Sequence, residues 1–146
     1  MPTPDGISSD DWNTVRDLVM IVMSATTADA RSASIGQLFA FLDELDRTYG
    51  RRPSLLATRA DFLDDDSRRV QMLEEAYALA SVLADHTNML FIAHSLAEFY
   101  LGEPPHPPHA RRWLTHMERH LAAVDHRDMA ASYERLRARL DALGWI

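Results

Sequence analysis

The sequence predicts an all-α protein, because its apolar residues recur at helical spacing in seven segments and no segment makes a convincing strand. Serine, aspartate, glycine and proline separate these segments, at the places where helices commonly begin and end. With 146 residues, the chain has the ordinary length of one domain. We expect a single helical domain over residues 1–146, with helices near residues 9–24, 34–49, 53–64, 67–84, 88–101, 108–124 and 127–143.

The first predicted helix covers residues 9–24. Residues 8–11, two serines followed by two aspartates, resemble a capping box with acidic side chains in the first turn, where the helix dipole favours them. The apolar run at 18–23 contains β-branched residues that are frequent in strands, but the capping signal favours a helix. Apolar residues point in all directions from this helix, which predicts that it is covered on more than one side.

The next two helices are separated by a glycine and a proline. Gly50 ends the helix at 34–49, as glycine commonly does one residue beyond a helix, and Pro53 opens the short helix at 53–64. The first of the two has an apolar stripe on one face. It consists of Ile35, Leu38, Phe39, Leu42 and Leu45.

The fourth and fifth helices form the middle of the chain. Three aspartates at 64–66 interrupt the apolar pattern and cap the helix at 67–84. The helix at 88–101 is apolar almost all round, which is typical of a central helix. We therefore expect Phe99, near its end, to be almost fully buried.

The last two helices follow a proline-rich connector at 102–108. The helix at 108–124 carries its apolar residues on one face. The helix at 127–143 is apolar on one side and charged on the other, so it is expected to face solvent at the end of a stack.

The helices pair into three hairpins of similar length, at residues 34–64, 67–101 and 108–143. A shift of 37 residues aligns apolar positions in all three, as for Phe39, Ala76 and Trp113. This internal repetition favours a helical repeat, with an irregular helical bundle as the alternative.

Residues 73–80 followed by 93–100 resemble the two helices of a tetratricopeptide repeat, most of all the repeats of bacterial regulators. Leu79 and Ala80 match the large-then-small pair of that family, and Pro104 lies near the position of its terminal proline. The resemblance implies a curved array of helix pairs whose inner face binds a protein or peptide. It implies no catalytic chemistry and no cofactor.

Composition narrows the classes of function. The chain has no cysteine, which excludes disulfides, thiolate metal sites and cysteine nucleophiles. The formal net charge of −7 argues against nucleic acid as a partner, because binding phosphates requires a clustered basic surface. Residues 1–6 lack the basic start of a secretory signal, and the apolar run 18–23 is too short to span a membrane. We therefore expect a cytoplasmic protein without a membrane partner.

Histidines offer one alternative function. His116 and His120 lie four residues apart on one predicted helix and could bind one metal ion, with His109 two turns earlier. The residue directly after His116 is Met117, whereas metalloproteases with this histidine spacing have a glutamate there as their general base. A metal-binding protein or metalloenzyme is therefore the second hypothesis, behind a protein with no metal. His94 and Glu98 form the one further polar pair that could belong to a site.

The leading hypothesis is a non-enzymatic adaptor, regulator or chaperone-like binder. In a tetratricopeptide-like array the first helix of each hairpin lines the inner face, so the helices at 34–49, 67–84 and 108–124 are expected there. The exposed residues predicted to contact a protein or peptide are Arg68, Arg69, Arg112, His116 and Arg119. A homodimer through paired helices at 127–143 is a further alternative.

Overall fold

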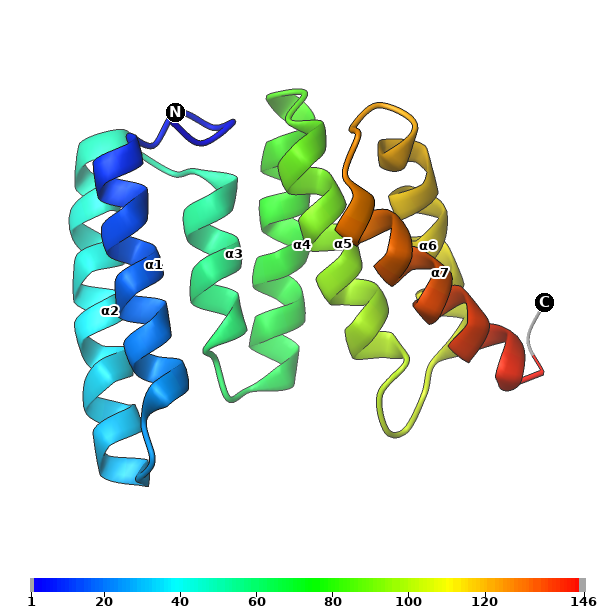
Figure 1. Cartoon of the computed structure of the whole chain (residues 1–146), viewed down its shortest axis with the longest axis horizontal. Helices are drawn as coiled ribbons and strands as arrows, with labels where there is room; N and C mark the ends of the chain where they lie inside the picture. The colour runs from blue at the N-terminus through cyan, green and yellow to red at the C-terminus, as the bar shows by residue number, and fades with distance from the viewer. Residues whose placement is uncertain (1, 145–146) are drawn as a thin grey trace.

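A computed structural model describes residues 2–144 and confirms the all-α class (Figure 1). This part of the chain forms seven helices and no strand. None of these helices combines the length and the apolar character needed to cross a bilayer. The helices are α1 (Ser9–Ser24), α2 (Ala28–Tyr49), α3 (Pro53–Asp61), α4 (Asp66–Val82), α5 (His86–Tyr100), α6 (Pro107–Leu121) and α7 (Arg127–Ala142).

Capping residues explain where the first two helices begin and end. The Ser8 side chain accepts a hydrogen bond from the backbone N–H of Asp11, as the capping-box pattern predicted. Thr27 caps α2 in the same way, so this helix begins at Ala28 and not near residue 34. Gly50 ends α2 with a φ of 77°, a left-handed conformation that glycine adopts without strain.

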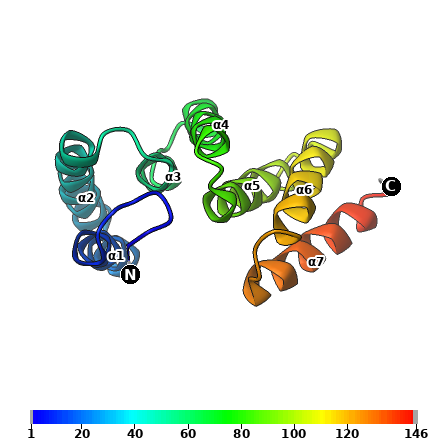
Figure 2. The same cartoon turned by 90° about the horizontal axis from the view of Figure 1, so that it is seen from above.

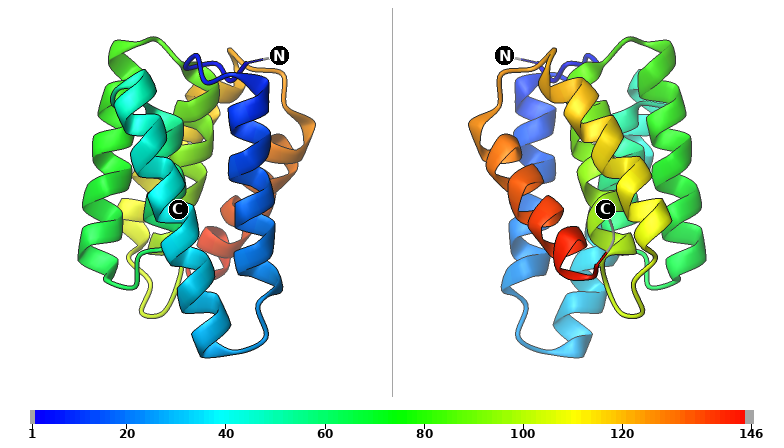
Figure 3. Two further views of the ribbon diagram at one scale, coloured as in Figure 1. Left: turned by 90° about the vertical axis from the view of Figure 1, so that its left-hand side faces the viewer. Right: turned by 90° about the vertical axis from the view of Figure 1, so that its right-hand side faces the viewer.

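The helices form two rows that curve into an arc. Seen from above, α2, α4 and α6 lie along the outer side, and α1, α3, α5 and α7 lie along the inner side (Figure 2). The end views show that α1 and α7, at opposite ends of the chain, lie on the same side of the molecule (Figure 3). Helix α1 packs on α2, α3 on α4, and α5 on both α4 and α6, whereas α2 and α3 make the lightest contact of any consecutive pair.

Two hydrophobic cores meet at α3. Helices α1, α2 and α3 enclose the first core, to which α3 contributes Leu55. Helices α3 to α7 enclose the second, to which α3 contributes Leu56. Helix α5 is central to the second core, as expected, because Leu90 and Leu96 on it are completely buried and it contacts four other helices.

Two predicted burial patterns are wrong. Helix α1 is covered on one side only, because α2 is the single helix of the described chain that packs closely against it. Met20, Ile21 and Met23 on α1 are consequently exposed, by 63%, 50% and 65% of their surface. Phe99 is only partly buried, because its side of α5 faces the hollow in front of α3 and not another helix.

A distant carboxylate caps helix α3, which has no side-chain cap at its own N-cap residue. Asp5 is buried and accepts a hydrogen bond at 2.8 Å from the backbone N–H of Ser54, in the first turn of α3. Asp5→Ala should therefore lower the free energy of unfolding by about 1–2 kcal/mol, the usual loss for a helix cap. Urea denaturation tests this. The exposed Asp64 is the control, since Asp64→Ala should change stability little, and equal stability of the Asp5 variant and wild type would contradict the assignment.

Candidate functional site

Two adjoining hollows form a groove lined mainly by α1, α3 and α5. These three helices lie along the inner side of the arc (Figure 2). Its larger hollow has a volume of about 810 Å³ and its smaller hollow about 380 Å³. The two hollows are continuous, because four residues line both of them. These are Trp12, Thr58, Asp61 and Ser95.

Apolar side chains form much of the groove. Helix α1 provides the wall, and Phe99 from α5 and Phe62 at the end of α3 add aromatic surface to the floor. The residues of α1 that line the larger hollow include Trp12, Val15, Val19, Met20 and Met23. Two of the exposed apolar residues of α1, Met20 and Met23, thus belong to the groove and its rim, whereas Ile21 does not.

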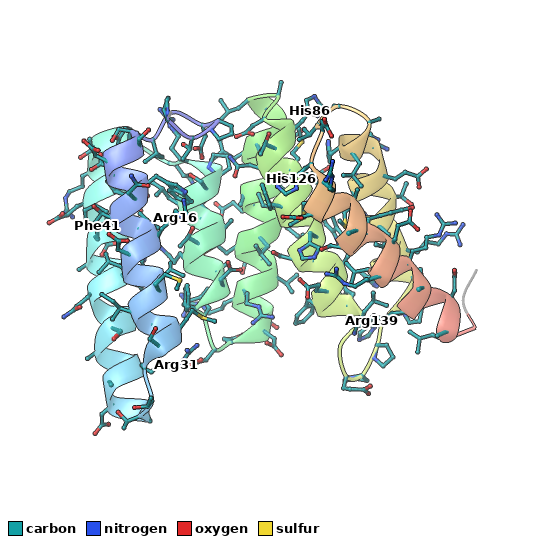
Figure 4. The ribbon with its side chains drawn as sticks, viewed as in Figure 1. Arg16, Arg31, Phe41, His86, His126 and Arg139 are labelled. Carbon is teal, nitrogen blue, oxygen red and sulfur yellow. The ribbon has the colours of Figure 1, made fainter. Side chains whose placement is uncertain are left out.

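Helix α7 stands beside α5 at the far end of the groove. His126, at the start of α7, lies against Phe91 of α5, with their ring centroids 5.2 Å apart (Figure 4). The Nδ1 atom of His126 also accepts a hydrogen bond from the backbone N–H of Met129. Further along α7, Arg139 donates a hydrogen bond to the carbonyl oxygen of Leu101, which ties this helix to the end of α5.

Asp61 lies at the end of α3, in the part of the groove that both hollows share. Loss of hydration there raises the pKa of its carboxyl group from 3.8 to about 6, while Arg69 lowers it and Glu98 raises it further. Asp61 is nevertheless exposed to solvent at the mouth of the groove, which moderates this shift. A carboxyl group with a raised pKa in a concave site is typical of functional sites.

His94 and Glu98, the pair that the sequence brought to notice, both line the groove. The Nδ1 atom of His94 lies 3.2 Å from a carboxylate oxygen of Glu98, one helical turn away. Burial lowers the pKa of His94, and the nearby Arg135 lowers it too, whereas Glu98 opposes this shift. The charge of Arg135 on α7 therefore acts on a histidine of the groove.

The two hydroxyl groups in the shared part of the groove are occupied by their own helices. Thr58 donates to the carbonyl oxygen of Ser54 at 2.8 Å, and Ser95 donates to that of Phe91 at 3.3 Å. Each bond joins residues one turn apart on one helix. An activated nucleophile requires a hydrogen bond to a neighbouring base. Neither of these hydroxyls has one.

The structure separates the five residues predicted to contact a partner. Arg69 on α4 lines the groove, but Arg68, its neighbour, does not. Arg112, His116 and Arg119 all lie on α6 in the outer row, and the guanidinium of Arg112 stacks 5.3 Å from the ring centroid of Trp113. The groove is thus lined mainly by α1, α3 and α5, with Arg31 from α2 and with Arg69 and Leu73 from α4. Helix α6, which was expected to line the inner face, contributes no residue to it.

The three histidines considered as metal ligands are also separated. His109 stacks on Tyr100, with ring centroids 4.8 Å apart, whereas His116 and His120 lie further along α6. Residues 2–144 contain no group of three histidine, aspartate or glutamate side chains that could hold a metal ion. His116 and His120 instead share a partner, because both form hydrogen bonds with the hydroxyl of Tyr77 on α4.

His120, which is buried, is the centre of a polar network that reaches the surface at His86. Its Nε2 atom lies 2.6 Å from the Tyr77 hydroxyl, and its Nδ1 atom lies 3.1 Å from Nδ1 of His86 at the start of α5. Burial, together with His86, His116 and Arg119, lowers the pKa of His120 to about 4. Burial also lowers the pKa of His116, with Arg119 and Arg112 adding to the effect. The network joins α4, α5 and α6 on the side away from the groove.

Sequence reasoning missed the apolar wall of the groove. The signal was present on α1, whose apolar residues at 18–23 exceed what one packed face requires.

Comparisons of the chain with protein-family models, with curated proteins and with solved structures found no match. The function is therefore inferred from the residues that line the groove and from their chemistry.

Proposed function

We propose that the chain is a non-enzymatic binding module, such as an adaptor, regulator or chaperone-like protein, which holds a protein or peptide in the groove. We further propose that its helix pairs form a tetratricopeptide-like array and that binding takes place in the cytoplasm. The groove itself carries the proposal, because helices α1 to α5 all contribute to its lining and exposed apolar side chains such as Met20 and Met23 border it. Clustered exposed apolar residues mark interaction sites in folded proteins.

The polar groups of the groove also favour binding over catalysis. The hydroxyls of Thr58 and Ser95 are bound to backbone carbonyls, so neither is prepared for nucleophilic attack. Glu98 is paired with His94, and Asp61 has no ion-pair partner in the described chain. Apolar surface with a few fixed polar groups is the usual composition of a recognition site.

The proposal is tested by capturing partners from native cells on the immobilised protein and quantifying them by mass spectrometry. A partner bound by the wild-type chain should be lost with Met20→Glu. Met20 is 63% exposed, so a charge there leaves the fold intact in the free protein. In the complex the same charge would be buried against an apolar partner without a counter-ion, which is unfavourable.

A matched control introduces the same charge away from the groove. Val82 on α4 is 84% exposed and does not line the groove. Val82→Glu should keep the partner that Met20→Glu loses. A partner that both variants retain, or that both lose equally, would contradict binding in the groove.

A further inference from the structure

Three arginines line the larger hollow of the groove: Arg16 from α1, Arg31 from α2 and Arg69 from α4. Arg16 and Arg31 lie along the side of α1 that faces α3 (Figure 4). Within residues 2–144 none of the three forms an ion pair, although the chain has 22 acidic residues and only 15 basic ones. Three unpaired cations in one hollow of an acidic protein point to an anionic ligand.

The carboxyl groups of the same hollow offset these arginines only in part. The larger hollow has two, Asp61 and Glu98. Asp61 stays mostly ionised near neutral pH even though its pKa is raised to about 6. Glu98 also keeps its charge, because the pKa of its partner His94 is lowered and this histidine adds no positive charge near neutral pH. The three arginines therefore exceed the two carboxylates by one charge. Arg69 is held over the ring of Phe99, 5.6 Å from its centroid, which keeps its charge within the hollow and next to apolar surface.

The groove walls determine which conformation a peptide can adopt. All the lining helices satisfy their backbone N–H and C=O groups internally, and the hydroxyls of Thr58 and Ser95 are already bound. An extended peptide would bury its own backbone groups here without partners, which costs free energy. A helical peptide satisfies its backbone internally and offers an apolar stripe to Trp12, Met20 and Phe99.

We infer that the groove binds an acidic amphipathic α-helix of a partner protein. Its apolar stripe packs on α1 and α5, and its carboxylates pair with Arg16, Arg31 and Arg69. This inference rests on the proposed function, because it specifies the partner of the same groove. Paired charges of this kind act mainly on the rate of encounter and on specificity, whereas the apolar contacts provide most of the affinity.

The test uses two synthetic stapled helices with the same apolar stripe, one with glutamate and one with lysine at every polar position. Fluorescence anisotropy with the whole protein should show the glutamate helix binding on the order of tenfold more tightly, with the difference shrinking as salt rises. The double variant Arg16→Gln, Arg69→Gln should remove most of this preference and leave the melting temperature unchanged. The matched variant Arg112→Gln, Arg119→Gln, on the outer row, should keep the preference.

The outcomes separate this inference from the proposed function. Equal or tighter binding of the lysine helix, or an unchanged preference in the Arg16 and Arg69 variant, overturns the acidic partner. If neither helix binds but Met20→Glu still loses a captured partner, the inference fails and the groove remains the binding site. Self-association of the protein alone, abolished by Met20→Glu in sedimentation, would identify a second copy as the occupant and would also overturn the inference.

Discussion

Leu96→Ala should lower the free energy of unfolding by about 2–5 kcal/mol, the range for leucine truncation in a packed core. Leu96 is completely buried on α5, within the core enclosed by α3 to α7. Two contributions add up in this loss: the hydrophobic free energy of the removed atoms, and the cost of a cavity that the surrounding helices fill only in part. Urea denaturation of both proteins at neutral pH measures the difference.

Phe99→Ala is the comparison that makes this result informative. Phe99 lies on the same helix and is larger, but it is only partly buried because it faces the groove. Its truncation should therefore cost clearly less than that of Leu96. A Phe99 variant as unstable as the Leu96 variant would mean that this side of α5 belongs to the core and does not line an open groove.

The second large effect is a loss of stability in acid that depends on His120. The pKa of its imidazole falls from an ordinary 6.5 to about 4 on folding, so the unfolded chain binds this proton more tightly than the folded one. Stability is therefore fully present above about pH 6.5 and decreases as the pH falls toward 4. The shift corresponds to up to about 3 kcal/mol, since each pKa unit is worth about 1.4 kcal/mol.

His120→Gln tests this assignment, because glutamine retains hydrogen-bonding groups for Tyr77 and does not titrate. Between pH 7 and pH 4 the variant should lose less stability than the wild type, by up to the same amount of about 3 kcal/mol. His109→Gln, which replaces an exposed histidine on the same helix, should follow the wild-type profile. Parallel profiles for the His120 variant and wild type would show that acid acts elsewhere.

Helix positions were predictable wherever local chemistry determines them. The Ser8 cap gave the start of α1, Gly50 the end of α2, and Pro53 the start of α3. The start of α2 was missed because Thr27 is followed by alanines and polar residues with no apolar stripe, so the periodic signal begins only at Ile35. Caps and stripes are properties of neighbouring residues, and a sequence records both directly.

The groove could not be predicted because it depends on how helices are paired in space. The same apolar pattern results whether the first helix of each pair is α2 or α3. The pairing nevertheless decides which helices line the inner side of the array. Phe99 shows the same limit, since spacing places it on an apolar face and cannot tell a core from a groove. The sequence likewise does not show that His120 is a buried polar group, because its hydrogen-bond partners Tyr77 and His86 lie on two other helices.

The most direct test of the groove as the binding face is a methyl NMR spectrum of the protein labelled at methionine, recorded with and without its captured partner. Met20 and Met23 border the groove, whereas Met117 and Met129 belong to α6 and α7. We expect the methyl signals of Met20 and Met23 to shift on binding while those of Met117 and Met129 stay in place. Shifts at Met117 and Met129 with unchanged Met20 and Met23 signals would contradict the account and place the partner on α6 and α7.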